Sequence, residues 1–254
     1  MFNFNEINKT YLYDGTFEGL LTIVFNCYVN NVIPINVLNQ NTYVPSLVDT
    51  YEYIQTDIEK ASRILNGITN NISDECLYKN YTAFLSEVEN KEINILKYIL
   101  FGFKVGAEID QMLSIDSVLF VEKTKRAVWL EGQRLKGFVR FSQIADNLFY
   151  SRITPDNSIL QILGEHFARR FPNQNFILHD AKRKIAFIYN TKQFSIIDAS
   201  TVNIPEISED EQNYKNLWKA FVKAVAIKER RNPRLQKQFM PRRYWKHMFE
   251  TEIY

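Results

Sequence analysis

The side chains best suited to binding a ligand are the cations near the C-terminal end. Residues 228–247 contain eight Lys and Arg side chains and a single acid, with Phe239, Tyr244 and Trp245 among the charges. A dense positive field with aromatic faces suits a polyanion whose bases can stack, which means a nucleic acid. The alternative is a solvated basic tail, or a terminal helix that packs through its aromatic residues.

Seven of these cations are expected to contact nucleic-acid phosphates. They are Arg230, Arg231, Arg234, Lys237, Arg242, Arg243 and Lys246. Tyr244 and Trp245 either stack on a base or attach the final helix to the body of the protein. Packing is favoured for Trp245, and both roles stay open for Tyr244, which is retained as a candidate nucleic-acid contact.

A second basic cluster is expected on a helix over Ile159–Phe171. His166, Arg169 and Arg170 are three and four residues apart, so they lie on one side of such a helix. The cluster can hold a phosphate, with His166 as a hydrogen-bond donor or proton shuttle. The favoured alternative is a helix at the edge of the core, with His166 hydrogen-bonded inside.

Two arginines around residue 137 are candidates for an anion or base clamp. Arg134 is three residues from Glu131 on an expected helix, and the two can pair. Arg140 is expected in the middle of a strand over Gly137–Phe141, where it must lie in a cleft or pair with an acid such as Glu131 or Asp156. A buried ion pair that joins helix to sheet is the equally supported alternative.

Catalytic candidates are weak. His179 and Asp180 end an expected strand and, with His166, could do acid–base work. Adjacent strand residues face opposite sides, so His179 and Asp180 do not form a dyad. The sequence contains no HExxH, CxxC, GxGxxG or GxxxxGK[ST] motif, so it predicts no metal and no cofactor. Asp14 most simply forms a turn with Gly15.

Charge divides the chain into two regions. Residues 1–116 hold 7 Lys and Arg against 15 Asp and Glu, whereas residues 117–254 hold 24 against 14. We therefore expect a mostly helical acidic region, 1–116, and a basic α+β region, 117–254, as two domains or as one compact domain. The basic half is expected to meet an anion, unless the two halves simply attract each other.

The first half is predicted to be mostly helical. A strand over Thr10–Tyr13 and a turn precede a helix over Thr16–Asn30, and residues 31–54 are expected to be irregular. Further helices are predicted from a capping box at Thr56–Glu59 and over residues 73–88, 91–105 and 116–136.

The second half is predicted to form an antiparallel sheet crossed by helices, so the fold class is α+β with a basic helical C-terminus. Strands are expected over Gly137–Phe141, Leu148–Ile153, Phe176–His179, Ile185–Tyr189 and Phe194–Ile197. Besides the helix at Ile159–Phe171, a long helix is expected over Glu209–Arg230, and a short final helix has Pro241 at its first position.

The remaining features predict a reduced, cytoplasmic protein. Cys27 and Cys76 fall in helical patterns and are expected to be buried. There is no apolar run of about 18 residues and no basic segment typical of a signal peptide, so no membrane contact is expected.

Six segments, taken together, resemble one bacterial family, the "probable DNA metabolism protein" family. They are Tyr11–Gly19, Ala83–Ser86, Glu131–Arg134, Gly137–Phe141, His166–Phe171 and Glu229–Lys246, and the last is the most specific. The resemblance implies DNA processing or repair but no particular reaction. Members are similar to a region linked to uracil-DNA-glycosylase-like domains, and they commonly pair with a radical-SAM-type protein. This chain has no CxxxCxxC, so it is not that partner.

We therefore expect a DNA-binding accessory protein in DNA repair or DNA metabolism that acts with a partner enzyme. The acidic half is expected to dock the radical-SAM-type partner near Glu87, Glu89 and Glu92, with these acids exposed. The alternative is a nucleic-acid-processing enzyme, such as a nuclease, lyase or glycosylase-like protein, that uses a cleft of His, Arg and acidic side chains. A protein-binding scaffold is the third possibility.

Overall fold

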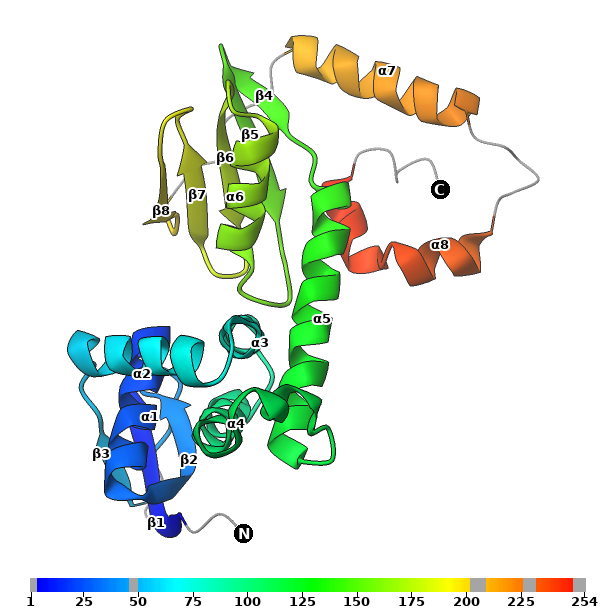
Figure 1. Cartoon of the computed structure of the whole chain (residues 1–254). Helices are drawn as coiled ribbons and strands as arrows, with labels where there is room; N and C mark the ends of the chain where they lie inside the picture. Colours follow the sequence, from blue (N-terminus) through cyan, green and yellow to red (C-terminus); the bar gives the residue numbers. More distant parts are fainter. Residues whose placement is uncertain (1–3, 46–49, 202–208, 226–231, 249–254) are drawn as a thin grey trace. The chain divides into compact units, whose positions relative to one another are not determined.

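The computed structural model describes residues 4–45, 50–201, 209–225 and 232–248, and Figure 1 shows its helices and strands. The chain divides into two compact units, Met1–Trp129 and Leu130–Tyr254, which we call the first and second units. The boundary falls within helix α5 (Asp116–Phe138). Helices and strands occur in both units, so the fold is α+β, as the sequence predicts.

The first unit contains a three-stranded parallel sheet in the order β2-β1-β3. Its strands are β1 (Asn5–Tyr13), β2 (Val32–Asn39) and β3 (Tyr51–Tyr53). β1 contains the predicted strand, but the prediction that residues 31–54 are irregular is wrong for β2 and β3. β2 is an edge strand, where the missing N–H of Pro34 is tolerated. β2 therefore forms because it pairs with β1, and its local sequence pattern does not indicate a strand.

The helices of the first unit agree closely with the sequence pattern. They are α1 (Phe17–Asn30), α2 (Ile58–Asn71), α3 (Asp74–Phe84), α4 (Lys91–Val105) and the 3₁₀ helix η1 (Gly106–Gln111). Thr16 caps α1 by accepting a hydrogen bond from the N–H of Gly19. The N-cap of α2 is Asp57, because its carboxylate accepts from the N–H groups of Glu59 and Lys60, whereas the Thr56 hydroxyl donates to Asp14.

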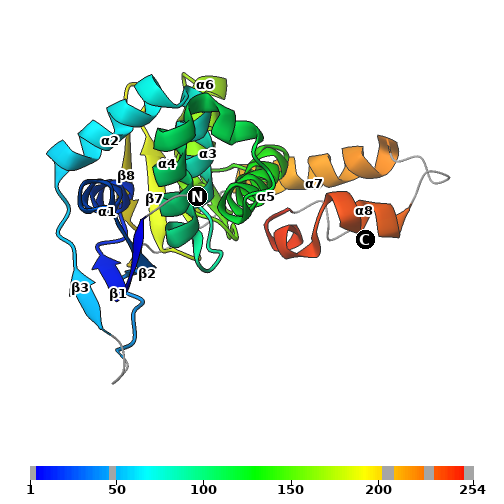
Figure 2. The same cartoon turned by 60° about the horizontal axis from the view of Figure 1, so that its bottom comes forward.

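Figure 2 shows α1 between α2 and the three strands, and this position makes α1 the centre of the core. Leu20, Ile23 and Val24 of α1 are fully buried, and each such side chain contributes about 1.5–3 kcal/mol through removal from water. Cys27 and Cys76 are buried free cysteines, as predicted. Burial raises the pKa of each thiol to about 12, so both remain neutral and unreactive.

The second unit contains a five-stranded mixed sheet in the order β4-β5-β6-β7-β8. The strands are β4 (Ser142–Ala145), β5 (Leu148–Ile153), β6 (Asn175–Asp180), β7 (Ile185–Tyr189) and β8 (Phe194–Asp198). The predicted antiparallel sheet needs one correction, because β5 and β6 are parallel. Helix α6 (Leu160–Arg170) connects them and returns the chain to the starting edge, as a crossover between parallel strands requires.

The predicted strand over Gly137–Phe141 is wrong. α5 continues to Phe138, and β4 begins only at Ser142. By contrast, β5 and β7 have the predicted bounds. α6 covers one face of the sheet (Figure 1) and approaches β7 closely, because a Cβ on Gly164 would lie 2.3 Å from the ring of Phe187. A glycine is therefore required at this contact.

The C-terminal part contains α7 (Glu209–Val225), α8 (Pro233–Phe239) and the 3₁₀ helix η3 (Arg242–His247). The predicted helix over Glu209–Arg230 is confirmed as far as Val225, and the rest lies outside the described residues. Pro233 is the first residue of α8, whereas Pro241 is the N-cap of η3 and not its first helical residue. Leu217 and Phe221 of α7 are exposed.

Candidate functional site

The second unit has a hollow of about 480 Å³ lined by cations and aromatic rings. Lys136 and Arg170 come from the last turns of α5 and α6, and Arg140 follows α5. Phe141 and Phe171 supply aromatic surface, and among the described residues no acid lines the hollow. We call it the basic hollow. Its lining suits an anion that also carries flat apolar groups.

The aromatic side of the basic hollow is held by ring contacts. Phe171 stacks on Phe167 with the planes 3° apart, and Phe141 meets Phe167 edge to face with the centroids 5.2 Å apart. Phe141 also contacts Phe176 of β6, which connects the hollow to the sheet. Arg170 lies 5.7 Å above the ring of Phe171. Phe141 and Phe171 are therefore positioned before any ligand arrives.

Arg140 occupies a different position from the one predicted. It is not in a strand, and its Nη1 donates to the carbonyl oxygens of Gly137 and Val139 at 2.7 and 3.1 Å. A cation at these carbonyls stabilises the end of α5. Neither Glu131 nor Asp156 is its ion-pair partner among the described residues. Arg140 nevertheless lines the basic hollow, as a clamp residue would.

His166, Arg169 and Arg170 lie near one another on α6, as predicted, and Lys136 of α5 joins them. Burial lowers the pKa of His166, and the charges of Lys136, Arg169 and Arg170 lower it further. His166 is half-buried, and both arginines are exposed. The imidazole is therefore neutral near pH 7 and lies beside a concentration of positive charge.

Glu131 holds a buried network and does not pair with Arg134 among the described residues. Its carboxylate accepts hydrogen bonds from the backbone N–H of Asp156 at 2.7 Å and of Asn157 at 2.9 Å. The side-chain amide of Asn157 donates at 2.6 Å, and the hydroxyl of Tyr244 donates at 2.7 Å. Four donors satisfy a carboxylate that is only 3% exposed, so Glu131 has a structural role.

Neighbouring ion pairs extend this network. Asp156 pairs with Arg243 at 2.9 Å, and both side chains are about half exposed. On the sheet side, Asp180 accepts from the backbone N–H groups of Lys182 and Arg183 and pairs with Arg183 Nη1 at 2.9 Å. Asp180 thus closes the β6–β7 hairpin, and its charge partly offsets the lowering of the His179 pKa that burial and Arg152 cause.

His179 is buried, and its Nδ1 lies 2.8 Å from the hydroxyl of Tyr150. Burial lowers its pKa, and the nearby charge of Arg152 lowers it further. His247 lies on η3, where its Nε2 is 3.1 Å from the hydroxyl of Thr154. Burial and the charges of Lys246 and Arg152 lower the pKa of His247 to about 4. The sequence reasoning missed His247 and Arg152, because only the fold brings His179 beside Arg152 and His247 to Thr154.

The C-terminal cations divide into two groups. Arg230 and Arg231 lie outside the described residues. Those that the structure describes are exposed: Arg234, Lys237, Arg242, Arg243 and Lys246. Tyr244 is only 2% exposed, so it presents no face to a base, and packing is its role. Trp245 is half-buried, with its Nε1–H donating to the carbonyl of Met240.

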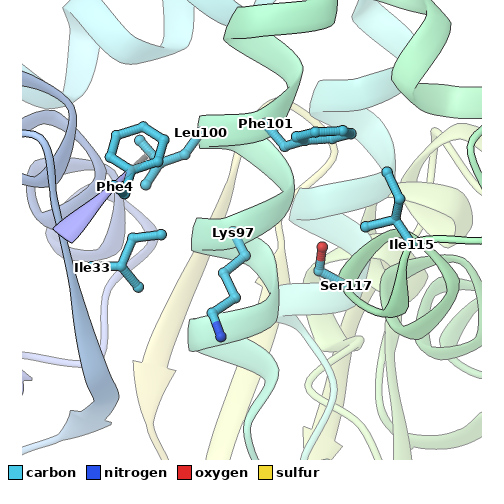
Figure 3. A pocket seen from close by; sticks show the side chains of 7 residues that line it. All are labelled: Phe4, Ile33, Lys97, Leu100, Phe101, Ile115 and Ser117. Carbon is cyan, nitrogen blue, oxygen red and sulfur yellow. The ribbon is translucent and has the colours of Figure 1, made fainter. Parts of the chain in front are cut away.

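In the first unit, a hollow of about 270 Å³ is almost wholly apolar. Figure 3 shows Phe4, Ile33 and Leu100 on one side of Lys97 and Phe101 and Ile115 on the other. Apart from Lys97 and Ser117, no described residue of the lining carries a polar side chain. This hollow therefore offers apolar packing and no acid–base pair.

The acids expected to dock a partner do not all lie on the surface. Glu87 and Glu89 are exposed, but Glu92 is buried and accepts a hydrogen bond from the hydroxyl of Tyr13 at 3.2 Å. The prediction of exposure is wrong for Glu92, because α4 begins at Lys91 and turns the side chain of Glu92 inward. Asp14 accepts from Thr16 and Thr56, in accordance with the turn role favoured from sequence.

Among the described residues, no three His, Cys, Asp or Glu side chains lie together in a way that could hold a metal ion. None of the helices in the described parts of the chain is both long and apolar enough to cross a membrane.

A family model matches residues 89–250, which is more than half of the chain. The chain belongs to that family. Its description is "Domain of unknown function (DUF4130)". No curated protein matches the chain. Among solved structures, the chain is similar to a pGpG-specific phosphodiesterase, PggH from Vibrio cholerae, with 10% identity and a TM-score of 0.35 over 85% of this chain and 98% of the other. A likeness at this TM-score supports no inference about fold or activity.

Proposed function

We propose that the chain binds nucleic acid, DNA in the first instance, through the basic hollow of its second unit. The supporting observation is that Lys136, Arg140 and Arg170 share one hollow with Phe141 and Phe171, with no acid among its described lining residues. Cations neutralise phosphates, and exposed ring surface stacks on bases. A hollow that offers both is suited to a single strand or to an unpaired base.

The exposed cations of α8 and η3 extend the positive surface of the same unit. Arg234, Lys237, Arg242 and Lys246 are exposed, and none of them has an ion-pair partner among the described residues. Phosphate contacts made by such side chains position a strand without reading its sequence. Binding is therefore expected to show little sequence preference and a strong dependence on salt.

The proposed role is that of an accessory protein in DNA metabolism or repair. The resemblance supports this context, together with a radical-SAM-type enzyme as partner. Glu87 and Glu89 give the first unit an exposed acidic segment, which a DNA backbone repels and a basic protein surface attracts. Co-purification of the two proteins, with Glu87→Lys/Glu89→Lys as the weakened variant, tests the partnership. Failure to associate with or without DNA contradicts it.

DNA binding is tested by fluorescence anisotropy with single-stranded and duplex oligonucleotides across a salt series. The variant Lys136→Gln/Arg170→Gln removes two cations whose side chains make no hydrogen bond with the described residues. Each phosphate contact contributes about 0.7–0.9 to the log–log salt slope. The slope is therefore expected to fall by about 1.4–1.8. Lys192→Gln, at an exposed position in the β7–β8 turn, is the control. An unchanged slope in the double variant refutes binding at the hollow.

The stacking part of the proposal has its own test. Phe171→Leu keeps an apolar side chain but removes the flat ring, so single-stranded DNA should bind more weakly by about 1–3 kcal/mol. Duplex binding should change less, because paired bases are not available to stack. Equal weakening for both substrates, with the melting temperature unchanged, contradicts stacking at Phe171.

One observation favours a nucleic-acid-processing enzyme as the second candidate. Two histidines of lowered pKa, His179 and His247, both lie near Arg152. Neutral imidazoles beside a cation are able to move protons near a phosphate. Incubation of the purified chain with intact and damaged oligonucleotides, with and without divalent metal, tests this candidate. If the chain alone turns over an oligonucleotide, it is an enzyme and not an accessory protein.

A further inference from the structure

The second unit carries a second group of anion-binding side chains, on the face of its sheet that is opposite to α6. Arg152 of β5 is in register with His179 of β6, so their side chains lie on the same face. Tyr150, two residues before Arg152, shares that face and bonds to His179. Phe176 is three residues before His179 and faces the other side, where it contacts Phe141 of the basic hollow. The two sites are therefore separate.

The third member of this group is His247, which lies on the 3₁₀ helix η3. His247 reaches the hydroxyl of Thr154, which follows the end of β5 and is two residues beyond Arg152. The charge of Arg152 lowers the pKa of both His179 and His247. The geometry agrees, because Arg152 is in register with His179, η3 packs against β5, and the Thr154 that His247 contacts is two residues beyond Arg152. Arg152, His179 and His247 thus form one cluster, built from β5, β6 and η3.

The charge balance of this cluster favours an anion. Arg152 is exposed and has no acidic partner among the described residues. The acid closest in sequence to His179 is Asp180, which is committed to Arg183 and the hairpin. Lys246 adds a further positive charge near His247. No carboxylate in the described chain therefore competes with a ligand for the Arg152 guanidinium.

The hydroxyls of Tyr150 and Thr154 each contact one nitrogen of a histidine ring, and this contact bears on which nitrogen carries the ring proton. Burial raises the pKa of Tyr150, so its hydroxyl keeps its proton, and it lies 2.8 Å from Nδ1 of His179. When this hydroxyl donates, the proton of the neutral His179 ring resides on Nε2. When the hydroxyl of Thr154 donates to Nε2 of His247, the proton of that ring resides on Nδ1. In these tautomers each ring retains one N–H, and neither ring makes a further hydrogen bond with the described residues.

We propose that Arg152, His179 and His247 bind the terminal phosphate of a nucleic-acid strand. A phosphomonoester presents three oxygen acceptors, and a planar guanidinium with two N–H donors from separate elements matches them better than it matches a planar carboxylate. Internal phosphodiesters have only two free oxygens and two bulky ester links. The identity of the ligand rests on the proposed function, whereas the anion site rests on the cluster alone.

The experiment follows the imidazole protons by NMR, because the chain has only three histidines. The probes are a 5′-phosphorylated oligonucleotide, the same oligonucleotide with a 5′-hydroxyl, its 3′-phosphorylated form, and inorganic phosphate. The signals of His179 and His247 should shift with a phosphorylated end and not with hydroxyl ends. His166 lies beside Lys136 and Arg170 of the basic hollow, so its signal reports binding at the hollow separately from binding at the end site.

Arg152→Gln should weaken the end-dependent binding about ten-fold or more, because one charge-assisted contact is lost. Arg152→Lys retains the charge without the planar guanidinium, so it should retain only part of the end-dependent binding that Arg152→Gln loses. Lys192→Gln, at an exposed position in the β7–β8 turn and in neither proposed site, is the control. If Arg152→Gln unfolds, the NMR comparison of the oligonucleotides on the unmodified chain decides alone.

The outcomes separate this inference from the proposed function. Oligonucleotide binding that ignores the terminal phosphate, with no selective shift of His179 and His247, overturns the end site and leaves binding at the basic hollow intact. Selective shifts that survive in Lys136→Gln/Arg170→Gln, without salt-dependent binding of the strand, support the end site and refute the hollow. Shifts of His179 and His247 that are equal for phosphorylated and hydroxyl ends also overturn it.

Discussion

The hydroxyl of Tyr244 donates a 2.7 Å hydrogen bond to Glu131, a residue 113 positions earlier in the chain. Both side chains are buried. Through this bond the C-terminal η3 is fixed to the last part of α5, and through Asp156 and Asn157 the same carboxylate holds the loop after β5. Burial and the bond to Glu131 raise the pKa of Tyr244, so the hydroxyl remains a donor.

Glu131→Ala is expected to destabilise the second unit by about 3–5 kcal/mol, because it leaves several buried donors without an acceptor. Tyr244→Phe removes one donor and should cost less, about 1–3 kcal/mol. Thermal and denaturant unfolding measure both changes. Gln133→Ala, at an exposed position on α5, is the control and should stay within about 0.5 kcal/mol. If Glu131→Ala leaves the free energy of unfolding unchanged, the network does not hold η3.

Gly164→Ala is expected to destabilise the contact between α6 and β7. Its Cβ would lie 2.3 Å from the Phe187 ring, which must then move within a packed core. Overpacking of this kind costs about 1–3 kcal/mol. Gly132→Ala is the matched comparison, because no atom lies within 4 Å of its added Cβ. In the interior of α5 that change should stabilise by about 0.5–1 kcal/mol. In unfolding experiments, Gly164→Ala should lower the free energy of unfolding and Gly132→Ala should raise it.

Acid should destabilise the second unit through His247. Its pKa falls from 6.5 to about 4 on folding, mainly because the ring is buried. Between these values the unfolded chain binds more protons than the folded chain, so stability is fully present above about pH 6.5 and decreases as the pH falls towards 4. His247→Gln should show a smaller loss of melting temperature between pH 7 and pH 5. An unchanged loss would place the sensitivity elsewhere.

The first unit should respond to pH in the opposite sense at Glu92. Burial raises the pKa of this carboxyl, so the folded chain holds the proton more tightly than the unfolded chain, and stability falls as the pH rises through that range. Glu92→Gln keeps an acceptor for the Tyr13 hydroxyl and removes the buried charge. It should raise the melting temperature at pH 7 and leave it unchanged at pH 4. Glu89→Gln, at an exposed position, is the control and should leave the melting temperature unchanged at both pH values.

Arg242 and Arg243 should contribute unequally to DNA binding. Arg243 is paired with Asp156 at 2.9 Å, whereas Arg242 is exposed and lies 5.8 Å from the Trp245 ring centroid. Arg242→Ala should reduce the log–log salt slope by about 0.7–0.9. Arg243→Ala should change the slope less and also lower stability slightly. If neither affinity nor slope changes in Arg242→Ala/Arg243→Ala, these cations serve intramolecular pairing.

Local sequence determined those elements whose signals are local. Thr16 is both the predicted start and the observed N-cap of α1, and α4 has its predicted bounds, because caps and apolar periodicity act within a few residues. The same holds for β5 and β7, where branched and aromatic residues are bounded by turns. The proximity of His166, Arg169 and Arg170 also followed from helical spacing alone.

Tertiary structure decided everything that depends on contacts distant in sequence. β2 is ordered by pairing with β1, and the parallel pairing of β5 with β6 depends on the path of α6. Glu131 accepts from Asp156, Asn157 and Tyr244, although Arg134 is its nearest cation along the helix. A buried carboxylate is stabilised by the donors that surround it in space, and only the folded sheet, α5 and η3 together bring those donors to Glu131, or His247 to Arg152.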